Sequence, residues 1–167
     1  MPNHVKNKMT ISGNPESIDR LLAKVTTSES QFDFNGIIPM PDDIFKGNLG
    51  YEERRMYGAK NWYDWSWDNW GTKWNAYEIT VERDYDDQLR VEFLTAWSEP
   101  EPIFYALNEQ YPDLDIYVEF ANEDLGRDCG VFQNGDLIYY DDNENAFEYA
   151  ADIWEYTEEE IAEMKAE

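Results

Sequence analysis

The sequence predicts an α+β fold in which helices pack on one face of an antiparallel sheet. Two patterns carry this prediction. Several runs alternate apolar and polar residues with the period of a half-buried strand, and others repeat apolar residues at helical spacing. The 167 residues suffice for one domain with a core, and 42% of them are hydrophobic. An aromatic content of 16% separates the chain from disordered sequences, although 30% of its residues are charged.

The first third of the chain predicts a strand and a helix, followed by shorter elements. Residues 5–11 alternate as a strand does. Asn14 as a cap and Pro15 at the first helical position then mark a helix start. We expect a short second strand over 32–38 and a further helix over 51–57.

The remaining elements complete a pattern that suits one domain. They are a hairpin over 77–97, a helix over 103–111, a strand over 114–120, a hairpin around Asn134-Gly135, a helix over 149–154 and a short terminal helix. Capping boxes are expected at Ser98 with Glu101 and at Thr157 with Glu160. This order fits a ferredoxin-like core over 1–167. A Trp-rich helical insertion is expected at about 45–75, and an acidic C-terminal hairpin-helix extension at about 129–167.

Five of the seven tryptophans lie between residues 61 and 76. Such a stretch can plug a core, or it can form an aromatic recognition surface. We expect Trp70 and Trp74 in the core. Trp62, Trp65 and Trp67 are the better candidates for a partner-binding surface.

The charge is the strongest global property of the sequence. Against 13 basic side chains stand 37 acidic ones, a net charge of -24, and nearly all of the excess follows residue 58. Such a molecule repels phosphate backbones and acidic membranes and attracts basic protein surfaces, so direct binding of nucleic acid is not expected. The candidate partner-binding acids are Asp84, Asp86, Asp87, Asp141, Asp142, Glu144, Glu148, Asp152, Glu155, Glu158, Glu159 and Glu160.

Residues for catalysis and for cofactor binding are scarce. His4 is the only histidine and Cys129 the only cysteine, and neither has a local partner for nucleophilic chemistry. The sequence contains no phosphate-binding glycine loop and no zinc motif, so we predict no catalytic residue, metal or cofactor. The segment from Asp141 to Asp152 resembles a calcium loop, but Ala146 occupies the position of the turn glycine. A single cysteine and the lack of a signal peptide or membrane span predict a cytoplasmic protein.

Four segments resemble the YubB-like family of phage, plasmid and integrated-element proteins. These segments are Asn3-His4-Val5, FNGIIPMP at 34–41, NWGTKWNA at 69–76 and TAWS at 95–98. The resemblance implies a ferredoxin-like fold and a home on mobile DNA in a bacterial host. It implies no catalytic residue.

Three functional hypotheses follow. The first is a non-enzymatic inhibitor of a host defence protein, such as a CRISPR or restriction nuclease, whose basic channel it occupies as a DNA mimic. The second is an accessory protein of element replication or transfer that binds its partner through an aromatic patch. The third is a small hydrolase that uses paired carboxylates near the tryptophans.

Overall fold

A six-stranded antiparallel sheet forms the centre of the computed structural model, which describes residues 2–141 and 144–167. The strands are β1 (His4–Gly13), β2 (Tyr77–Tyr85), β3 (Gln88–Ala96), β4 (Leu114–Asn122), β5 (Gly130–Gln133) and β6 (Asp136–Tyr139). Their order is β2-β3-β1-β4-β5-β6, and every neighbouring pair is antiparallel. The first four strands have the arrangement of a ferredoxin-like domain, and the β5–β6 hairpin widens the sheet. The predicted fold class is confirmed.

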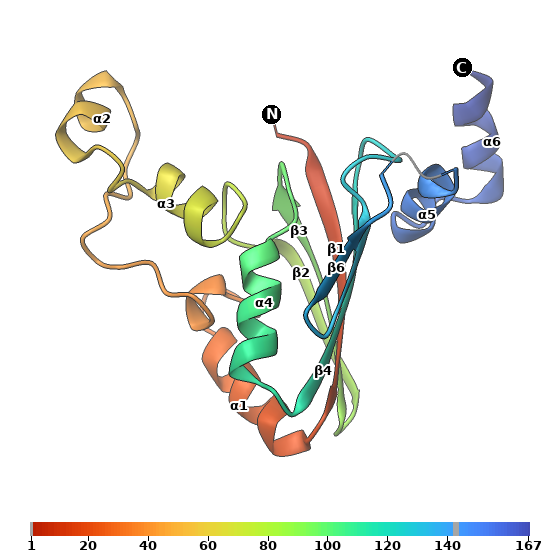
Figure 1. Cartoon of the computed structure of the whole chain (residues 1–167), viewed down its shortest axis with the longest axis horizontal. Helices are drawn as coiled ribbons and strands as arrows, with labels where there is room; N and C mark the ends of the chain where they lie inside the picture. Colours follow the sequence, from red (N-terminus) through yellow and green to blue (C-terminus); the bar gives the residue numbers. More distant parts are fainter. Residues whose placement is uncertain (1, 142–143) are drawn as a thin grey trace.

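The alternation along β1 divides the sheet into two faces. Val5, Met9 and Ile11 are buried on the inner face, which α1 (Pro15–Val25) and α4 (Glu101–Gln110) cover (Figure 1). Lys6 and Lys8 point to the outer face. The two helices expected over one face therefore lie on the inner face.

Helix α1 begins where the sequence predicts. The Asn14 side chain accepts a hydrogen bond from the Glu16 N–H at 2.9 Å, and Pro15 occupies the first helical position. Ile18, Leu21 and Val25 recur at helical spacing and are fully buried against the sheet.

A long insertion joins α1 to β2 and carries a 3₁₀ turn, η1 (Phe34–Gly36), and two helices, α2 (Tyr51–Tyr57) and α3 (Trp62–Asn69). The prediction of a strand over 32–38 is therefore wrong. The Asp33 carboxylate accepts the Asn35 N–H, which favours a turn. Phe34 enters the core beside Phe93 instead of pairing along a strand.

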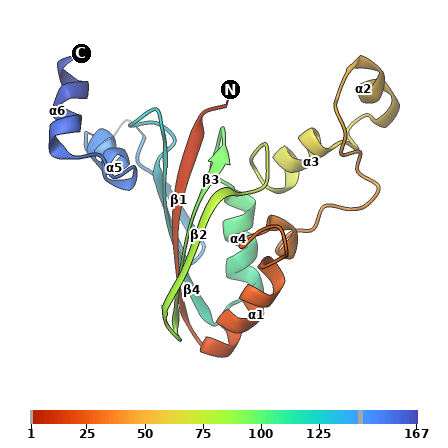
Figure 2. The same ribbon diagram turned by 180° about the vertical axis from the view of Figure 1, so that it is seen from behind.

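The C-terminal extension adds a hairpin and two helices, α5 (Ala146–Ile153) and α6 (Glu158–Ala166). Asn134 and Gly135 both have positive φ, 47° and 96°, as the expected two-residue turn requires. Helix α5 lies on the outer face, opposite α1 and α4 (Figure 2). The extension thus places a helical layer on part of the second face of the sheet.

The two expected capping boxes have different outcomes. Thr157 and Glu160 form one at the start of α6. The prediction of a capping box at Ser98 and Glu101 is wrong, because α4 begins at Glu101 with Pro100 as its N-cap, and no side chain caps it. None of the described helices is long and apolar enough to cross a membrane.

Candidate partner-binding surface

The chain ends in an acidic arm, which we define as residues 146–167. It contains eight acidic side chains and one basic side chain, Lys165. The arm projects from one end of the sheet (Figure 1), and no residue of α6 is buried. Its charges are therefore presented to solvent on a helical support.

Apolar contacts and one indole hydrogen bond attach α5 to the sheet. Ala150 and Ile153 are buried against Ala121 and Cys129. The Trp154 indole N–H donates to the Ala121 carbonyl at 2.9 Å. The amphipathic pattern of 149–154 predicted this apolar face, although sequence could not say which face of the sheet it covers.

Glu155 connects the arm to the middle of the sheet. Its carboxylate lies 3.8 Å from the Lys6 ammonium and 3.3 Å from the Lys8 ammonium on β1. Lys6, followed by Lys8, lowers the pKa of Glu155. Glu155 therefore orients the arm and is engaged by its own chain.

A second ion pair links the two helices of the arm. Glu148 on α5 pairs with Lys165 on α6, and the hydrogen bond from Lys165 lowers the pKa of Glu148. Glu160 is used in the capping box with Thr157. Among the described residues, the arm acids left without a recorded ion pair or capping role are Asp152, Glu158, Glu159, Glu163 and Glu167.

Three predicted acids, Asp141, Asp142 and Glu144, precede the arm. The Asp141 carboxylate accepts the Asp128 N–H at 2.9 Å and the Cys129 N–H at 3.1 Å, so it organises the loop before β5. Asp142 lies outside the described residues, and Glu144 is exposed. Within the described residues, no group of three or more potential ligands could hold a metal ion.

The β2–β3 turn holds Asp86 and Asp87, and Asp84 precedes it on β2; this turn lies at the opposite end of the sheet from the arm (Figure 1). Asp84 forms an ion pair with Arg90 at 2.5 Å. The backbone carbonyl of Asp86 accepts from Arg83, and that of Asp87 accepts the Gly13 N–H. The structure therefore separates the predicted acids into two groups and does not gather them on one patch.

The tryptophan stretch is mostly structural. Trp70 is 3% exposed and donates to the Ile38 carbonyl at 2.9 Å, so its core position is confirmed. Trp65 packs edge to face against Trp70. Trp62 donates to the Gly47 carbonyl, and Trp62, Trp65 and Trp67 are all half-buried.

Trp74 is 40% exposed, so its predicted core position is wrong. Gly71, with φ 74°, turns the chain after Trp70. The residues beyond it run to the rim of the sheet, where Trp74 meets Tyr77 edge to face. The sequence pattern could not show that the segment leaves the core between these two indoles.

Two shallow pockets lie on the outer face of the sheet, beside the arm. One, of about 200 Å³, is lined by Lys6, Glu78 and Trp154, among others. The next, of about 230 Å³, is lined by Thr80, Glu82, Arg90, Glu92 and Glu155. Both mix cations with carboxylates, which distinguishes this region from the first turn of α6, where Glu158, Glu159 and Glu160 are adjacent.

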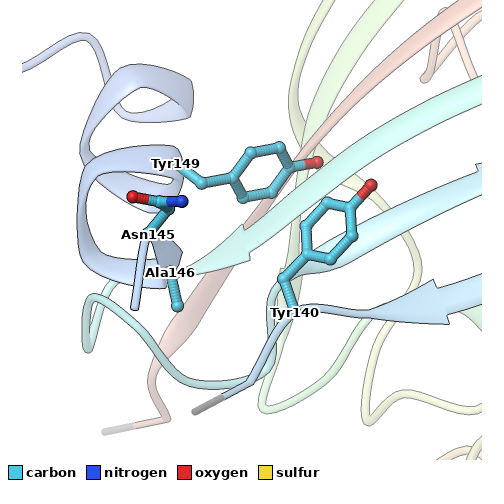
Figure 3. Close-up of a pocket in the computed structure, with 4 residues that line it drawn as sticks. All are labelled: Tyr140, Asn145, Ala146 and Tyr149. Carbon is cyan, nitrogen blue, oxygen red and sulfur yellow. The ribbon is translucent and has the colours of Figure 1, made fainter. Parts of the chain in front are cut away.

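A third pocket, of about 220 Å³, lies at the joint between β6 and α5 (Figure 3). Tyr140, Asn145, Ala146 and Tyr149 line it, and none of these residues is charged. The rings of Tyr140 and Tyr149 meet edge to face, and Tyr149 donates to the Gly130 carbonyl at 2.5 Å. These contacts brace the attachment of the arm.

Glu99 is a buried carboxyl that the sequence did not single out. It is 7% exposed and accepts a hydrogen bond from the Tyr139 hydroxyl. Burial raises the pKa of Glu99 to about 7, and Asp128 and Glu101 add to the increase. Its burial results from the docking of β6 beside the β3–α4 loop, a contact between segments 40 residues apart.

A family model described as the ferredoxin-like domain in Api92-like protein matches residues 69–165. The match spans more than half of the chain, from the end of α3 to α6, and so includes nearly all of the acidic arm. Comparisons with curated proteins and with solved structures found no match.

Proposed function

The chain belongs to the family of the ferredoxin-like domain in Api92-like proteins, and we propose that it is a non-enzymatic interaction protein whose acidic arm binds a basic protein surface. The partner in this proposal is a nucleic-acid-binding protein of host defence, such as a CRISPR effector or restriction nuclease. The arm occupies its nucleic-acid channel and presents carboxylates where the channel accepts phosphates.

The observation that carries the proposal is the geometry of the acidic arm. Glu158, Glu159 and Glu163 are exposed on a helix that projects from the sheet. A projecting acidic helix can enter a cleft lined by lysine and arginine, which a flat acidic surface cannot do. Its field also steers association, because opposite charges on two partners raise the rate of encounter.

Acids of the same chain neutralise about half of the cations. Among the described residues, seven of the 13 basic side chains form ion pairs with acids of the same chain. These are Lys6, Lys8, Lys60, Arg83, Arg90, Arg127 and Lys165. The other six face an excess of carboxylates, 37 acidic side chains in all, which supports a protein partner over direct binding of nucleic acid.

The origin on a phage, plasmid or integrated element is part of the same proposal. It rests on the resemblance of four segments, including NWGTKWNA at 69–76, to the YubB-like family. Proteins encoded on such elements meet host nucleases whose channels bind nucleic acid through positive charge.

The test is a capture experiment with the full chain. The immobilised protein is incubated with a bacterial lysate at about 50 mM salt. One portion is then washed with double-stranded DNA, and a second portion is washed with buffer at about 200 mM salt. We expect it to retain nucleic-acid-binding proteins that DNA displaces. The triple variant Glu158→Lys, Glu159→Lys and Glu163→Lys should lose them, and Glu160 is kept so that the capping box remains.

A matched control separates the position of the charge from its amount. Glu29→Lys, Asp42→Lys and Glu52→Lys change the net charge by the same amount at exposed sites outside the arm. If control and arm variants lose the captured proteins equally, or if neither loses them, the arm is not the binding site. Adding reversals at Asp86 and Asp87 tests the distant turn in the same way.

The exposed aromatic side chains favour a second candidate, an accessory protein of element replication or transfer. Tyr51 and Met56 on α2 are 78% and 73% exposed, and this exposed apolar surface outside the arm is what supports the second candidate. Under this candidate the arm variant binds as the unaltered protein does, whereas Tyr51→Ala with Met56→Ala loses the partner.

A further inference from the structure

Two exposed indoles lie at one end of the sheet. Trp74 is 40% exposed and Trp97 is 44% exposed. Both belong to segments that meet the first residues of β1. We call the surface formed by His4, Trp74, Tyr77 and Trp97 the aromatic corner.

Hydrogen bonds between three segments hold the aromatic corner in place. The Trp97 N–H donates to the Asn3 carbonyl at 2.9 Å. The buried Thr72 hydroxyl donates to the Ala96 carbonyl at 2.6 Å. The exposure of Trp97 is therefore fixed by the backbone around it and does not reflect a loose segment.

Backbone strain occurs at two residues of this region. Trp97 has φ 75° and Glu78 has φ 48°. Residues with a Cβ atom avoid this region at a cost of about 1–3 kcal/mol each, and for a bulky side chain it is an outlier. Glycine would adopt either conformation freely, so the chain retains an indole and a carboxylate here at the expense of stability.

The rings of His4, Tyr77 and Trp74 form one connected group, and Trp97 is attached to it through its backbone bond to Asn3. Trp74 and Tyr77 meet edge to face with centroids 6.3 Å apart, and His4 and Tyr77 do so at 5.5 Å. His4 Nδ1 and the Tyr77 hydroxyl are 2.6 Å apart. The rings are thus oriented before any partner arrives.

The aromatic corner has the electrostatic character of a cation site. The Lys73 ammonium lies 4.5 Å from the centroid of the Trp74 ring, which shows that this face accepts a cation. Carboxylates lie close by: Glu123 accepts the His4 N–H at 2.9 Å. Burial, followed by Glu78 and Glu123, raises the pKa of Tyr77 to about 12, as expected beside negative charge.

We infer that the aromatic corner anchors arginine side chains of the basic partner surface, by stacking the guanidinium on the indoles of Trp74 and Trp97. This inference rests on the proposed function, because it names the side chain that the basic partner contributes. The incoming guanidinium replaces Lys73 on Trp74, and Glu78 neutralises its charge. Arginine suits the site better than lysine, since its planar and weakly hydrated group stacks on aromatic faces.

Two surfaces of the molecule thus contribute differently to binding the basic partner. The acidic arm supplies long-range attraction, which salt screens. The aromatic corner supplies the short-range contact, in keeping with the enrichment of tryptophan, tyrosine and arginine among residues that dominate binding energy.

The experiment titrates the full chain with a peptide of alternating arginine and glycine. Matching peptides carry lysine, or citrulline, which keeps the planar shape without the charge. Indole N–H resonances, assigned with the variants, report which tryptophans the peptide contacts. We expect the arginine peptide to shift Trp74 and Trp97, the lysine peptide to bind more weakly and the citrulline peptide not to bind.

The deciding variant is Trp97→Gly, because glycine accepts the φ of this position and relieves its strain. We expect this variant to remain folded and to bind the arginine peptide about 5- to 30-fold more weakly, with a similar loss for Trp74→Ala. Tyr85→Ala, which removes a 67% exposed ring at the end of β2, is the control and should bind normally. Equal effects of Trp97→Gly and Tyr85→Ala, or equal binding of the arginine and citrulline peptides, would overturn the inference.

The outcomes also separate this inference from the proposed function. If reversal of the arm acids abolishes lysate capture while Trp97→Gly binds the peptide normally, the proposed function holds and the aromatic corner is not its anchor. If Trp97→Gly loses the peptide but capture is never displaced by DNA, the corner binds arginine and the proposed function is wrong.

Discussion

Replacing Glu99 by glutamine should make the protein more stable at neutral and higher pH and change little in acid. Burial raises the pKa of Glu99 from 4.5 to about 7 in the folded state. A carboxyl whose folded pKa is raised contributes stability that is fully present below its unfolded pKa and is lost as pH rises through the folded pKa. The window for Glu99 therefore runs from about pH 4.5 to about pH 7.

The size of the effect follows from that difference. Each tenfold change in proton affinity corresponds to about 1.4 kcal/mol, so ionisation of buried Glu99 costs about 3 kcal/mol at pH 8. Glutamine removes the charge but keeps an oxygen that accepts the hydrogen bond from the Tyr139 hydroxyl. We expect Glu99→Gln to raise the free energy of unfolding by up to about 3 kcal/mol at pH 8, and by less than about 1 kcal/mol at pH 5.

Urea unfolding followed by tryptophan fluorescence measures this effect at both pH values. The quantity to compare is the free energy of unfolding of the variant minus that of the unaltered protein at the same pH. The net charge of -24 makes the stability of both proteins depend on pH, and the difference removes this common effect. Glu109→Gln is the control for the loss of one charge, because Glu109 is exposed on α4, the helix that follows Glu99. A difference for Glu99→Gln that is the same at pH 5 and pH 8 would refute the reasoning.

Three further predictions concern the core and its borders. Trp70→Ala should lower the free energy of unfolding by about 3–5 kcal/mol, whereas Trp74→Ala should lower it by less than about 1 kcal/mol; urea unfolding compares the two. Gly71→Ala should destabilise the protein by about 1–3 kcal/mol, because φ is 74° and the added Cβ would lie 2.6 Å from Pro102 Cδ. A normal melting temperature for this variant would contradict that. Cys129 is buried and its pKa is raised to about 11, mainly by burial, so a thiol reagent at pH 8 should label it only after unfolding.

Local signals predicted the parts of the fold that local chemistry decides. The alternation over 5–11, the Asn14 cap and the Asn134-Gly135 turn each depend on neighbouring residues, and each was placed correctly. The capping box at Thr157 belongs with them, since its partners are three residues apart.

The errors occurred where distant segments decide the outcome. The expected strand over 32–38 becomes a turn because Phe34 packs on Trp70 and Phe93, and because Asn75 accepts the Phe34 N–H. Helix α4 starts after Pro100, and the Ser98 hydroxyl donates instead to the carbonyl of Gly71, 27 residues away. Neither contact leaves a pattern in the local sequence.

The candidate site was predicted in part. Composition identified the acidic C-terminal region, but only the structure shows that Glu155 is held by lysines of β1 and that Asp86 and Asp87 lie far from α6. The exposure of Trp97 and its strained backbone depend on the rim of the sheet, so spacing alone could not reveal them.

The seating of α5 on the outer face has a consequence for how the arm can be removed. A chain shortened before Ala146 would leave Lys6 and Lys8 without Glu155 and would uncover the apolar strip around Ala121. The shortened protein would therefore have both a local positive charge and an exposed apolar surface that favours aggregation. Truncation would create a different molecule, whereas single replacements on α6 alter the charge and leave the sheet covered.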